Sequence, residues 1–440
     1  MTAARRTMPP LLAALAAGAL AASAAWWTQR LGEALGPDAW TYWTSSIALR
    51  DGRGYVDGHG LPVTAWPIGY PAWLAMVQAV VGVSANALRL ADSLAIGVAA
   101  AFACGWALRR TRGAERDAAP TWPVVAAAAI GMAAAARGCA SEYLMLALLF
   151  AALWLHEGAA RRGPGWGRLA GVTALLAAAV LTRHAAHAFV PGFWFLLAGP
   201  AGSRARATGR WLALAGGVAA AWGLAQLALD QRGSLPFFAG QQPLGGLVGT
   251  MLRAIDRGLG VFPLGLAWFA AGWLALGPLR RRAARWLDLP AERLRHGAIG
   301  GFIGSSLLAL LAMFLVVYIA DPPRLRFVRF ASLLTLLVLA GVLRQVPAAR
   351  WRWPLLLLLL VPPAVPVVRD VVRGRTGQDS VTAEGGESFV PLDAVPGPAG
   401  SAPVRLPDGR LQVPTPRFVW QRDALERAAT APSASGREGR

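Results

Sequence analysis

A polar, aromatic segment at residues 36–52 follows the first apolar run of the chain and carries an acid close to its start. Asp38 is flanked there by Trp40, Tyr42 and Trp43 rather than by other charges. On a helix, Asp38 and Tyr42 would share one face, while the two tryptophans would anchor that helix at a membrane surface. An aspartate in this place either caps the helix or acts as a general base that takes a proton from a hydroxyl group. The residues alone leave both interpretations open.

A second acid, Glu142, follows Ser141 and opens another apolar run. A carboxylate at membrane depth is costly, so such residues usually cap a helix, pair with a cation or serve a function. The positive end of a helix dipole is one explanation of Glu142. The alternative is that Glu142 orients a substrate or a divalent metal near Asp38.

Arginines also lie at ends of apolar runs that the positive-inside rule would keep free of positive charge. Arg183 lies between two runs, and a later segment contains Arg324, Arg326 and Arg329. The planar guanidinium group matches phosphate oxygens, so these side chains predict binding of a phosphorylated lipid at the level of the headgroups. The alternative is snorkelling toward the phosphates of the surrounding bilayer.

Histidines next to Arg183 raise the question of a metal site. His184 and His187 could present two ring nitrogens on one helix face, with Asp57 and His59 as further ligands. Without a third ligand of fixed position, this spacing is more typical of ordinary polar residues.

The composition is that of a polytopic membrane protein. Of the 440 residues, 55% are hydrophobic and only 15% are charged, and the mean hydropathy is +0.45. The formal net charge of +20 comes from arginines in short clusters between apolar runs, which is the positive-inside pattern. A nucleic-acid-binding protein would instead show one continuous basic face. Cys104 and Cys139 have no partner spacing, so neither a disulfide framework nor a metal motif is expected.

Runs of spanning or near-spanning length predict an all-α integral membrane fold with about eleven transmembrane helices. They lie at residues 9–27, 86–108, 121–137, 141–157, 168–183, 185–199, 211–229, 258–279, 297–320, 327–343 and 353–368. The first run could instead be the core of a signal peptide, since Arg5 and Arg6 precede it.

The apolar run 66–82 is short, begins with Trp66-Pro67 and contains Pro71, so by itself it could cross the membrane or lie on its surface. It is expected to be an interfacial helix on the outer surface, because the later arginine clusters then fall on the same side as Arg5 and Arg6. These clusters lie at residues 109–116, 161–168, 204–210, 280–285 and 344–352. The orientation rule makes that side the cytoplasm, so the N-terminus is expected to be cytoplasmic. Nearly every polar residue suited to chemistry then falls on the outer face.

Two parts of the chain are expected. Residues 1–368 form the transmembrane domain, and its first outer loop, 28–85, holds the interfacial helices. Residues 369–440 form an outer C-terminal tail that is rich in Pro and Gly and mostly irregular. Within the tail, residues 404–413 alternate around an Asp-Gly turn and predict a short hairpin.

Taken in order, these motifs resemble the GT-C superfamily of polytopic glycosyltransferases, which includes the protein mannosyltransferases and the lipid A aminoarabinose transferase. The resemblance is strongest in the first outer loop, where Asp38-x-x-x-Tyr42 is followed by Ala48-Leu-x-x-Gly52, Trp66-Pro67-x-x-Tyr70-Pro71 and Ala87-x-Arg89-Leu90. Ser141-Glu142 is similar to the acid of that family's second outer loop, Leu181-Thr182-Arg183 to the end of a later span, and Arg326-Phe327 to a late "RY" motif. Two residues depart from the family pattern: Ala39 stands where many members have a second acid, and Trp66 where most have proline.

The resemblance implies transfer of a sugar from a polyprenyl-phosphate-linked donor to an acceptor hydroxyl on the outer face of a bacterial inner (plasma) membrane, with inversion at the anomeric carbon. The acceptor would be a lipid, a polysaccharide or a protein of the cell envelope. Asp38 would be the general base, and the substrate-binding residues would be Tyr42, Tyr70, Glu142, Arg183, His184, Arg326 and Arg329. No cofactor is firmly implied. A divalent metal stays open, although Ala39 weakens a site of paired loop acids.

Two other functions stay open. A flippase or transporter of lipid-linked glycans would show polar residues at mid-membrane depth or paired broken helices, and the sequence has few of these. A membrane polymerase or ligase that joins whole lipid-linked glycans would need the same arginines but a different base.

Overall fold

The computed structural model describes residues 9–29, 34–35, 37–58, 60, 62–63, 66–111, 141–157, 165–198 and 203–229, with short pieces at 302, 305–306, 309, 390–391, 404–405 and 411–412. Its helices, in chain order, are α1 (Pro10–Gln29), α2 (Pro37–Arg50), α3 (Gly69–Val81), α4 (Ala85–Thr111), α6 (Glu142–Glu157), α7 (Trp166–Thr182), the 3-10 helix η1 (His184–Phe189), α8 (Gly192–Ala198) and α9 (Arg204–Ala228). The all-α prediction is confirmed for these residues, apart from strands of two residues each.

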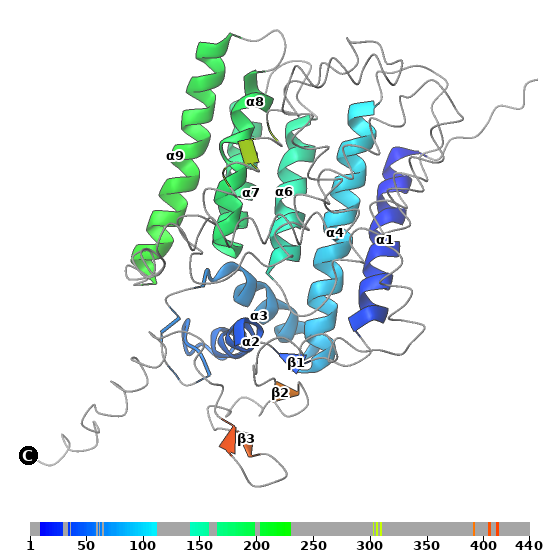
Figure 1. Cartoon of the computed structure of the whole chain (residues 1–440), viewed down its shortest axis with the longest axis vertical. Helices are drawn as coiled ribbons and strands as arrows, with labels where there is room; N and C mark the ends of the chain where they lie inside the picture. Colours follow the sequence, from blue (N-terminus) through cyan, green and yellow to red (C-terminus); the bar gives the residue numbers. More distant parts are fainter. Residues whose placement is uncertain are drawn as a thin grey trace, which may run out of the picture.

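The helices α1, α4, α6, α7 and α9 pack side by side in a bundle (Figure 1). Along the bundle α1 contacts α4, α4 contacts α6, α6 contacts α7, and α7 contacts α9. The helices α2 and α3 lie across one end, where α1 and α7 finish and α4 and α6 begin (Figure 1). This end is called the α2/α3 end below.

Small residues form the contact between α1 and α4. The buried face of α1 carries Ala13, Ala17, Ala21 and Ala25. At the crossing point the backbones come so close that a Cβ atom on Gly18 would lie 2.8 Å from the carbonyl oxygen of Gly97. The other face of α1 exposes leucines, with Leu11 70% exposed. Buried alanines and exposed leucines are typical of helices that pack against each other in lipid.

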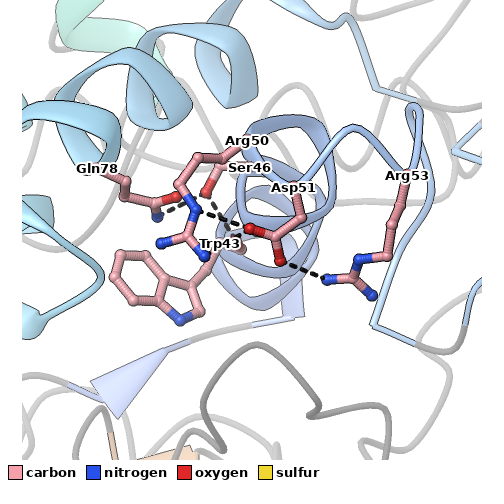
Figure 2. Close-up of polar contacts among 6 residues, drawn as sticks. All are labelled: Trp43, Ser46, Arg50, Asp51, Arg53 and Gln78. Carbon is pink, nitrogen blue, oxygen red and sulfur yellow. Dashed lines mark hydrogen bonds and ion pairs between the residues drawn. The ribbon is translucent and has the colours of Figure 1, made fainter.

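The helix α2 is buried although it is rich in hydroxyl side chains. Ser45 Oγ donates to the Thr41 carbonyl oxygen, and Ser46 Oγ donates to the Trp43 carbonyl oxygen at 2.7 Å. Bonds to the preceding turn satisfy such hydroxyl groups inside a helix. Gln78 of α3 in turn donates from Nε2 to Ser46 Oγ at 2.8 Å, which joins the two helices (Figure 2).

The start of α3 lies against the end of α7. A Cβ atom on Gly69 would stand 2.7 Å from the Leu181 carbonyl oxygen and 2.8 Å from Thr182 Oγ1, so only glycine permits this approach. The helix begins after Trp66-Pro67 and occupies most of the run 66–82. It lies across the bundle, in the way that an interfacial helix would (Figure 1).

Two described helical segments, Asn86–Trp106 within α4 and Arg204–Ala228, are long and apolar enough to cross a membrane. The first lies within the predicted run 86–108, and the second contains most of the predicted run 211–229 but already begins at Arg204. The runs 141–157 and 168–183 form α6 and α7. The predicted runs 121–137, 258–279, 327–343 and 353–368, and most of 297–320, lie outside the described residues.

The apolar run 185–199 does not form one continuous helix. It divides into η1 and α8, and Pro191 lies between them. Proline has no backbone N–H and its ring clashes with the preceding turn, which explains the interruption.

Short strands bring the tail to the first loop. β1 (Ala34–Leu35) pairs antiparallel with β2 (Val390–Pro391) just before α2 begins. In the segment where a hairpin is predicted, β3 (Val404–Arg405) pairs antiparallel with β4 (Leu411–Gln412).

Candidate functional site

Side chains from three separate parts of the chain meet at the α2/α3 end. They are Tyr42 of α2, Ser141 and Glu142 at the start of α6, and Arg183 directly after α7. Ser141 is separated from Tyr42 by 99 positions and from Arg183 by 42. The fold thus brings into contact residues that the sequence assigns to one site.

Arg183 is buried and holds two partners. Its Nη2 lies 3.0 Å from Glu142 Oε1, and its Nη1 donates to Ser141 Oγ at 2.8 Å. Arg183 is only 6% exposed and Glu142 only 2%. A buried charge is tolerated where it is paired with an opposite charge, and each residue here supplies that charge for the other. Snorkelling toward bulk lipid does not describe this arginine, because its guanidinium group is directed onto Glu142 and Ser141.

Tyr42 connects this ion pair to an aromatic cluster. Its hydroxyl oxygen lies 3.4 Å from Ser141 Oγ. Its ring makes T-shaped contacts with Tyr70 and Trp66, at centroid distances of 5.2 Å and 6.0 Å. Such edge-to-face pairs stabilise a fixed ring geometry. The aromatic cluster therefore holds α2 and α3 together at the point where α2 meets α6.

Asp92 was not among the site residues predicted from the sequence. The Tyr70 hydroxyl donates to Asp92 Oδ1 at 2.5 Å, and Asp92 is only 1% exposed. Tyr70 is fully buried, so its described contacts favour a positioning role over direct contact with a substrate. A signal was present, because Asp92 is an acid inside an apolar run of membrane-spanning length, where an ionisable residue is a functional candidate by default.

The structure describes the backbone of Asp38, in the first turn of α2. Asp38 lies four positions before Tyr42, so the two residues share one face of the helix. The helix begins at Pro37, and proline is favoured at the first helical position. This placement is compatible both with a stabilising charge at the helix start and with a general base.

His184 and His187 belong to an aromatic contact between η1 and α9. Their ring centroids are 6.3 Å apart, and Trp222 packs edge-on against both rings at 6.5 Å and 5.5 Å. His187 Nδ1 lies 2.9 Å from the His184 carbonyl oxygen. This packing places His184 next to Arg183 but directs the pair of histidines into protein contacts.

The residues that the structure describes do not fit a divalent metal. Among them, no group of three or more His, Cys, Asp or Glu side chains could hold an ion. Glu142, the acid that could orient a metal near Asp38, is instead paired with Arg183.

A charged turn follows α2 and differs from the buried pair. Arg50 donates from Nε to Asp51 Oδ1 at 2.8 Å, and Arg53 Nη2 lies 3.4 Å from Asp51 Oδ2 (Figure 2). These side chains are partly exposed, so their ion pairs contribute little to stability.

Beyond this turn, Tyr55 fastens the loop between α2 and α3. Its hydroxyl donates to the carbonyl oxygens of Trp66 and Pro67 at 2.9 Å and 3.1 Å. Burial, together with the nearby Tyr42, raises the pKa of Tyr55 well above its usual value. The Tyr55 phenol therefore keeps its proton and remains a donor.

Arg324, Arg326 and Arg329, which are predicted to bind phosphate, lie outside the described residues. That they lie close to Arg183 stays a prediction. No protein-family model, no curated protein and no solved structure matches the chain.

Proposed function

We propose that the chain is a polytopic membrane glycosyltransferase that moves a sugar from a polyprenyl-phosphate-linked donor to an acceptor hydroxyl. The observation that carries this proposal is the convergence of Tyr42, Ser141, Glu142 and Arg183 at the α2/α3 end. The resemblance to the GT-C superfamily assigns these residues to one outer site. Their mutual contacts in the fold support that assignment.

We infer that about eleven helices cross a bacterial inner membrane, with the N-terminus in the cytoplasm and the tail outside. The described helices support this orientation. Both α7 and α9 begin at the end of the bundle opposite α2 and α3, and their first turns carry Arg168, Arg204 and Arg206. Arginines collect on the cytoplasmic side of membrane proteins, which leaves the α2/α3 end facing outward.

The proposed reaction is an inverting displacement at the anomeric carbon. The acceptor oxygen attacks that carbon from the face opposite the phosphate, and Asp38 takes the hydroxyl proton as the new C–O bond forms. The bond between the anomeric carbon and the phosphate oxygen breaks, and polyprenyl phosphate leaves with the electron pair. A phosphate leaving group needs no strong acid, and guanidinium groups of Arg326 and Arg329 would stabilise its charge.

Arg183 has a more restricted role in this proposal. Its two terminal nitrogens already bind Glu142 and Ser141, so a donor phosphate that reaches Arg183 would share these donors. Arg183 therefore shapes the wall of the site and balances the charge of Glu142.

The test is transfer from radiolabelled polyprenyl-phosphate sugars, offered as a panel of hexoses and pentoses, to membranes of a strain that lacks the chain. Asp38→Asn should lower transfer at least about 100-fold, because general base catalysis contributes about 10²–10⁴-fold. Donor binding should persist. The matched control is Asp51→Asn, the same chemical change in the charged turn, which should transfer normally.

Two results would contradict the proposal. Transfer at the wild-type rate by the Asp38→Asn protein would remove Asp38 from the mechanism. Movement of the donor across a vesicle membrane by the wild-type protein, without release of polyprenyl phosphate, would indicate a flippase.

A further inference from the structure

Asp92 is a buried acid, and the proposed reaction assigns it no role. It lies about two turns into α4, within the segment Asn86–Trp106 that is long and apolar enough to cross a membrane. It is 1% exposed, and the Tyr70 hydroxyl donates to its Oδ1 at 2.5 Å. A phenol that donates to a carboxylate is expected at 2.5–2.7 Å when the acceptor is ionised, so the distance fits a charge-assisted bond.

The hydrogen bond of the Tyr70 hydroxyl does not by itself require an acid as its acceptor. The neighbouring contact between α2 and α3 uses a neutral pair, in which Gln78 donates to Ser46 at 2.8 Å. A neutral acceptor on α4 could bind Tyr70 in the same way and would avoid burying a charge. A carboxylate, however, accepts the hydrogen bond of the Tyr70 hydroxyl more strongly than a neutral group would.

The Tyr70 ring leads to the face of α2 that carries Asp38. Tyr70 meets Tyr42 edge-on, with ring centroids 5.2 Å apart and an interplanar angle of 78°. Tyr42 is one helical turn from Asp38 and lies 3.4 Å, by its hydroxyl oxygen, from Ser141 Oγ. A rotation of Tyr70 would thus displace Tyr42 and the first turns of α2.

We propose that Asp92 is a positioning residue. It fixes the orientation of the Tyr70 ring. Through the contact of Tyr70 with Tyr42, it fixes the position of the α2 face that carries Asp38 relative to Ser141 and Arg183. This inference rests on the proposed glycosyl transfer, since it assigns a separate task to each acid. Asp38 takes the proton of the acceptor, whereas Asp92 never contacts a substrate. A displacement of a catalytic group by about 1 Å can cost about 100-fold in rate, so a residue this far from the reaction can control it.

The experiment compares Asp92→Asn, Tyr70→Phe and the double variant of the full chain in detergent, with the donor panel and acceptor membranes described above. Asp92→Asn keeps an oxygen acceptor but removes the charge, and Tyr70→Phe keeps the ring but removes the hydroxyl group. Each should lower kcat about tenfold, while the donor KM changes less than about twofold, because the loss concerns the transition state and not donor binding. The double variant should be no slower than the slower single variant, because both changes break one interaction.

The control is Ser46→Ala, which removes the acceptor of Gln78 at the contact of α2 and α3. It should lower the melting temperature but leave kcat unchanged. A merely structural role of Asp92 would make Asp92→Asn behave in the same way, with a lower melting temperature and an unchanged kcat.

The outcomes separate this inference from the function on which it rests. If the wild-type protein transfers none of the sugars, both are overturned. If the wild type transfers sugar and either Asp92→Asn or Tyr70→Phe matches its kcat, only the role of Asp92 is overturned. Independent, multiplying losses in the double variant would also overturn it, since Asp92 would then not act through Tyr70. Should Asp92→Asn fail to insert, Tyr70→Phe decides alone, because it keeps the buried ring.

Discussion

Arg183 and Glu142 make each other's burial possible, and this dependence can be measured. Removing one member of a buried ion pair leaves the other charge without its main partner, which typically destabilises a protein by about 3–5 kcal/mol. We expect losses of that size for Arg183→Met and for Glu142→Gln. The double variant Arg183→Met/Glu142→Gln should lose less than the sum of the two single losses, because it leaves neither charge behind. Reversible denaturant unfolding of the detergent-solubilised protein would measure these differences.

The charged turn after α2 provides the reference for that measurement. Asp51 also pairs with arginines, but its side chain and those of Arg50 and Arg53 are partly exposed. Asp51→Asn should therefore cost no more than about 1 kcal/mol. Equal losses for Asp51→Asn and Glu142→Gln would show that the Glu142–Arg183 pair is not buried as described.

Single residues could be assigned to the site where they stand at the ends of apolar runs. Glu142 and Arg183 have this property, and Tyr42 lies in the polar segment 36–52 between two runs; the arginine clusters predict that all three lie on one side of the membrane. The residue Asp92 lacks this property, because it lies inside a run. Only the packing of α3 against α4 shows that the Tyr70 hydroxyl reaches it. The burial of Arg183 could not be predicted either, because an arginine at the end of an apolar run can snorkel toward lipid or pair with an acid, and the sequence does not distinguish the two.

At the level of helices, the close crossing of α1 and α4 depends on glycine. A Cβ atom on Gly97 would lie 2.9 Å from Ala22 Cβ and 3.0 Å from the Gly18 carbonyl oxygen. Gly97→Ala should force the helices apart and cost about 1–3 kcal/mol, in the range of other overpacked contacts. Gly216→Ala on α9 is the control, because its Cβ would meet no atom within 4 Å.

The melting temperature of the two proteins in detergent checks this expectation. Alanine favours a helix over glycine by about 1 kcal/mol, so Gly216→Ala should be neutral or stabilising. Gly97→Ala should melt at a lower temperature than the wild type. An unchanged melting temperature for Gly97→Ala would mean that α1 and α4 are farther apart than the structure shows.

Helices could be predicted from the sequence where hydrophobic length was sufficient, as for α4 and α9. The run 185–199 shows where length misleads, since its composition is continuous but Pro191 divides it into η1 and α8. The interfacial placement of 66–82 was inferred from the parity of the arginine clusters rather than from the segment itself. The close approach of Gly69 to Leu181, which fixes α3 against α7, has no signal in the sequence.

For the whole molecule, one orientation explains both the arginines and the site. The helices α7 and α9 begin with arginines at one end of the bundle, and the candidate site lies at the other (Figure 1). Because positive residues resist translocation, the arginine-rich end should face the cytoplasm. A donor with a polyprenyl tail would then reach the site from the outer leaflet.

Cysteine labelling of intact bacterial cells tests this orientation. In a background with Cys104→Ala and Cys139→Ala, one cysteine replaces Arg53, in the charged turn at the α2/α3 end, or Arg204, at the exposed start of α9. A membrane-impermeant maleimide should label the Arg53→Cys protein in intact cells, because the outer surface is open to it. The Arg204→Cys protein should react only after the membrane is permeabilised, which also serves as the control that this cysteine is reactive.

Labelling of Arg204→Cys alone in intact cells would place the site on the cytoplasmic side. Labelling of both proteins in intact cells would mean that the two ends of the bundle do not lie on opposite sides of the membrane. Transfer from a polyprenyl-phosphate donor at the outer surface would then be impossible for this chain.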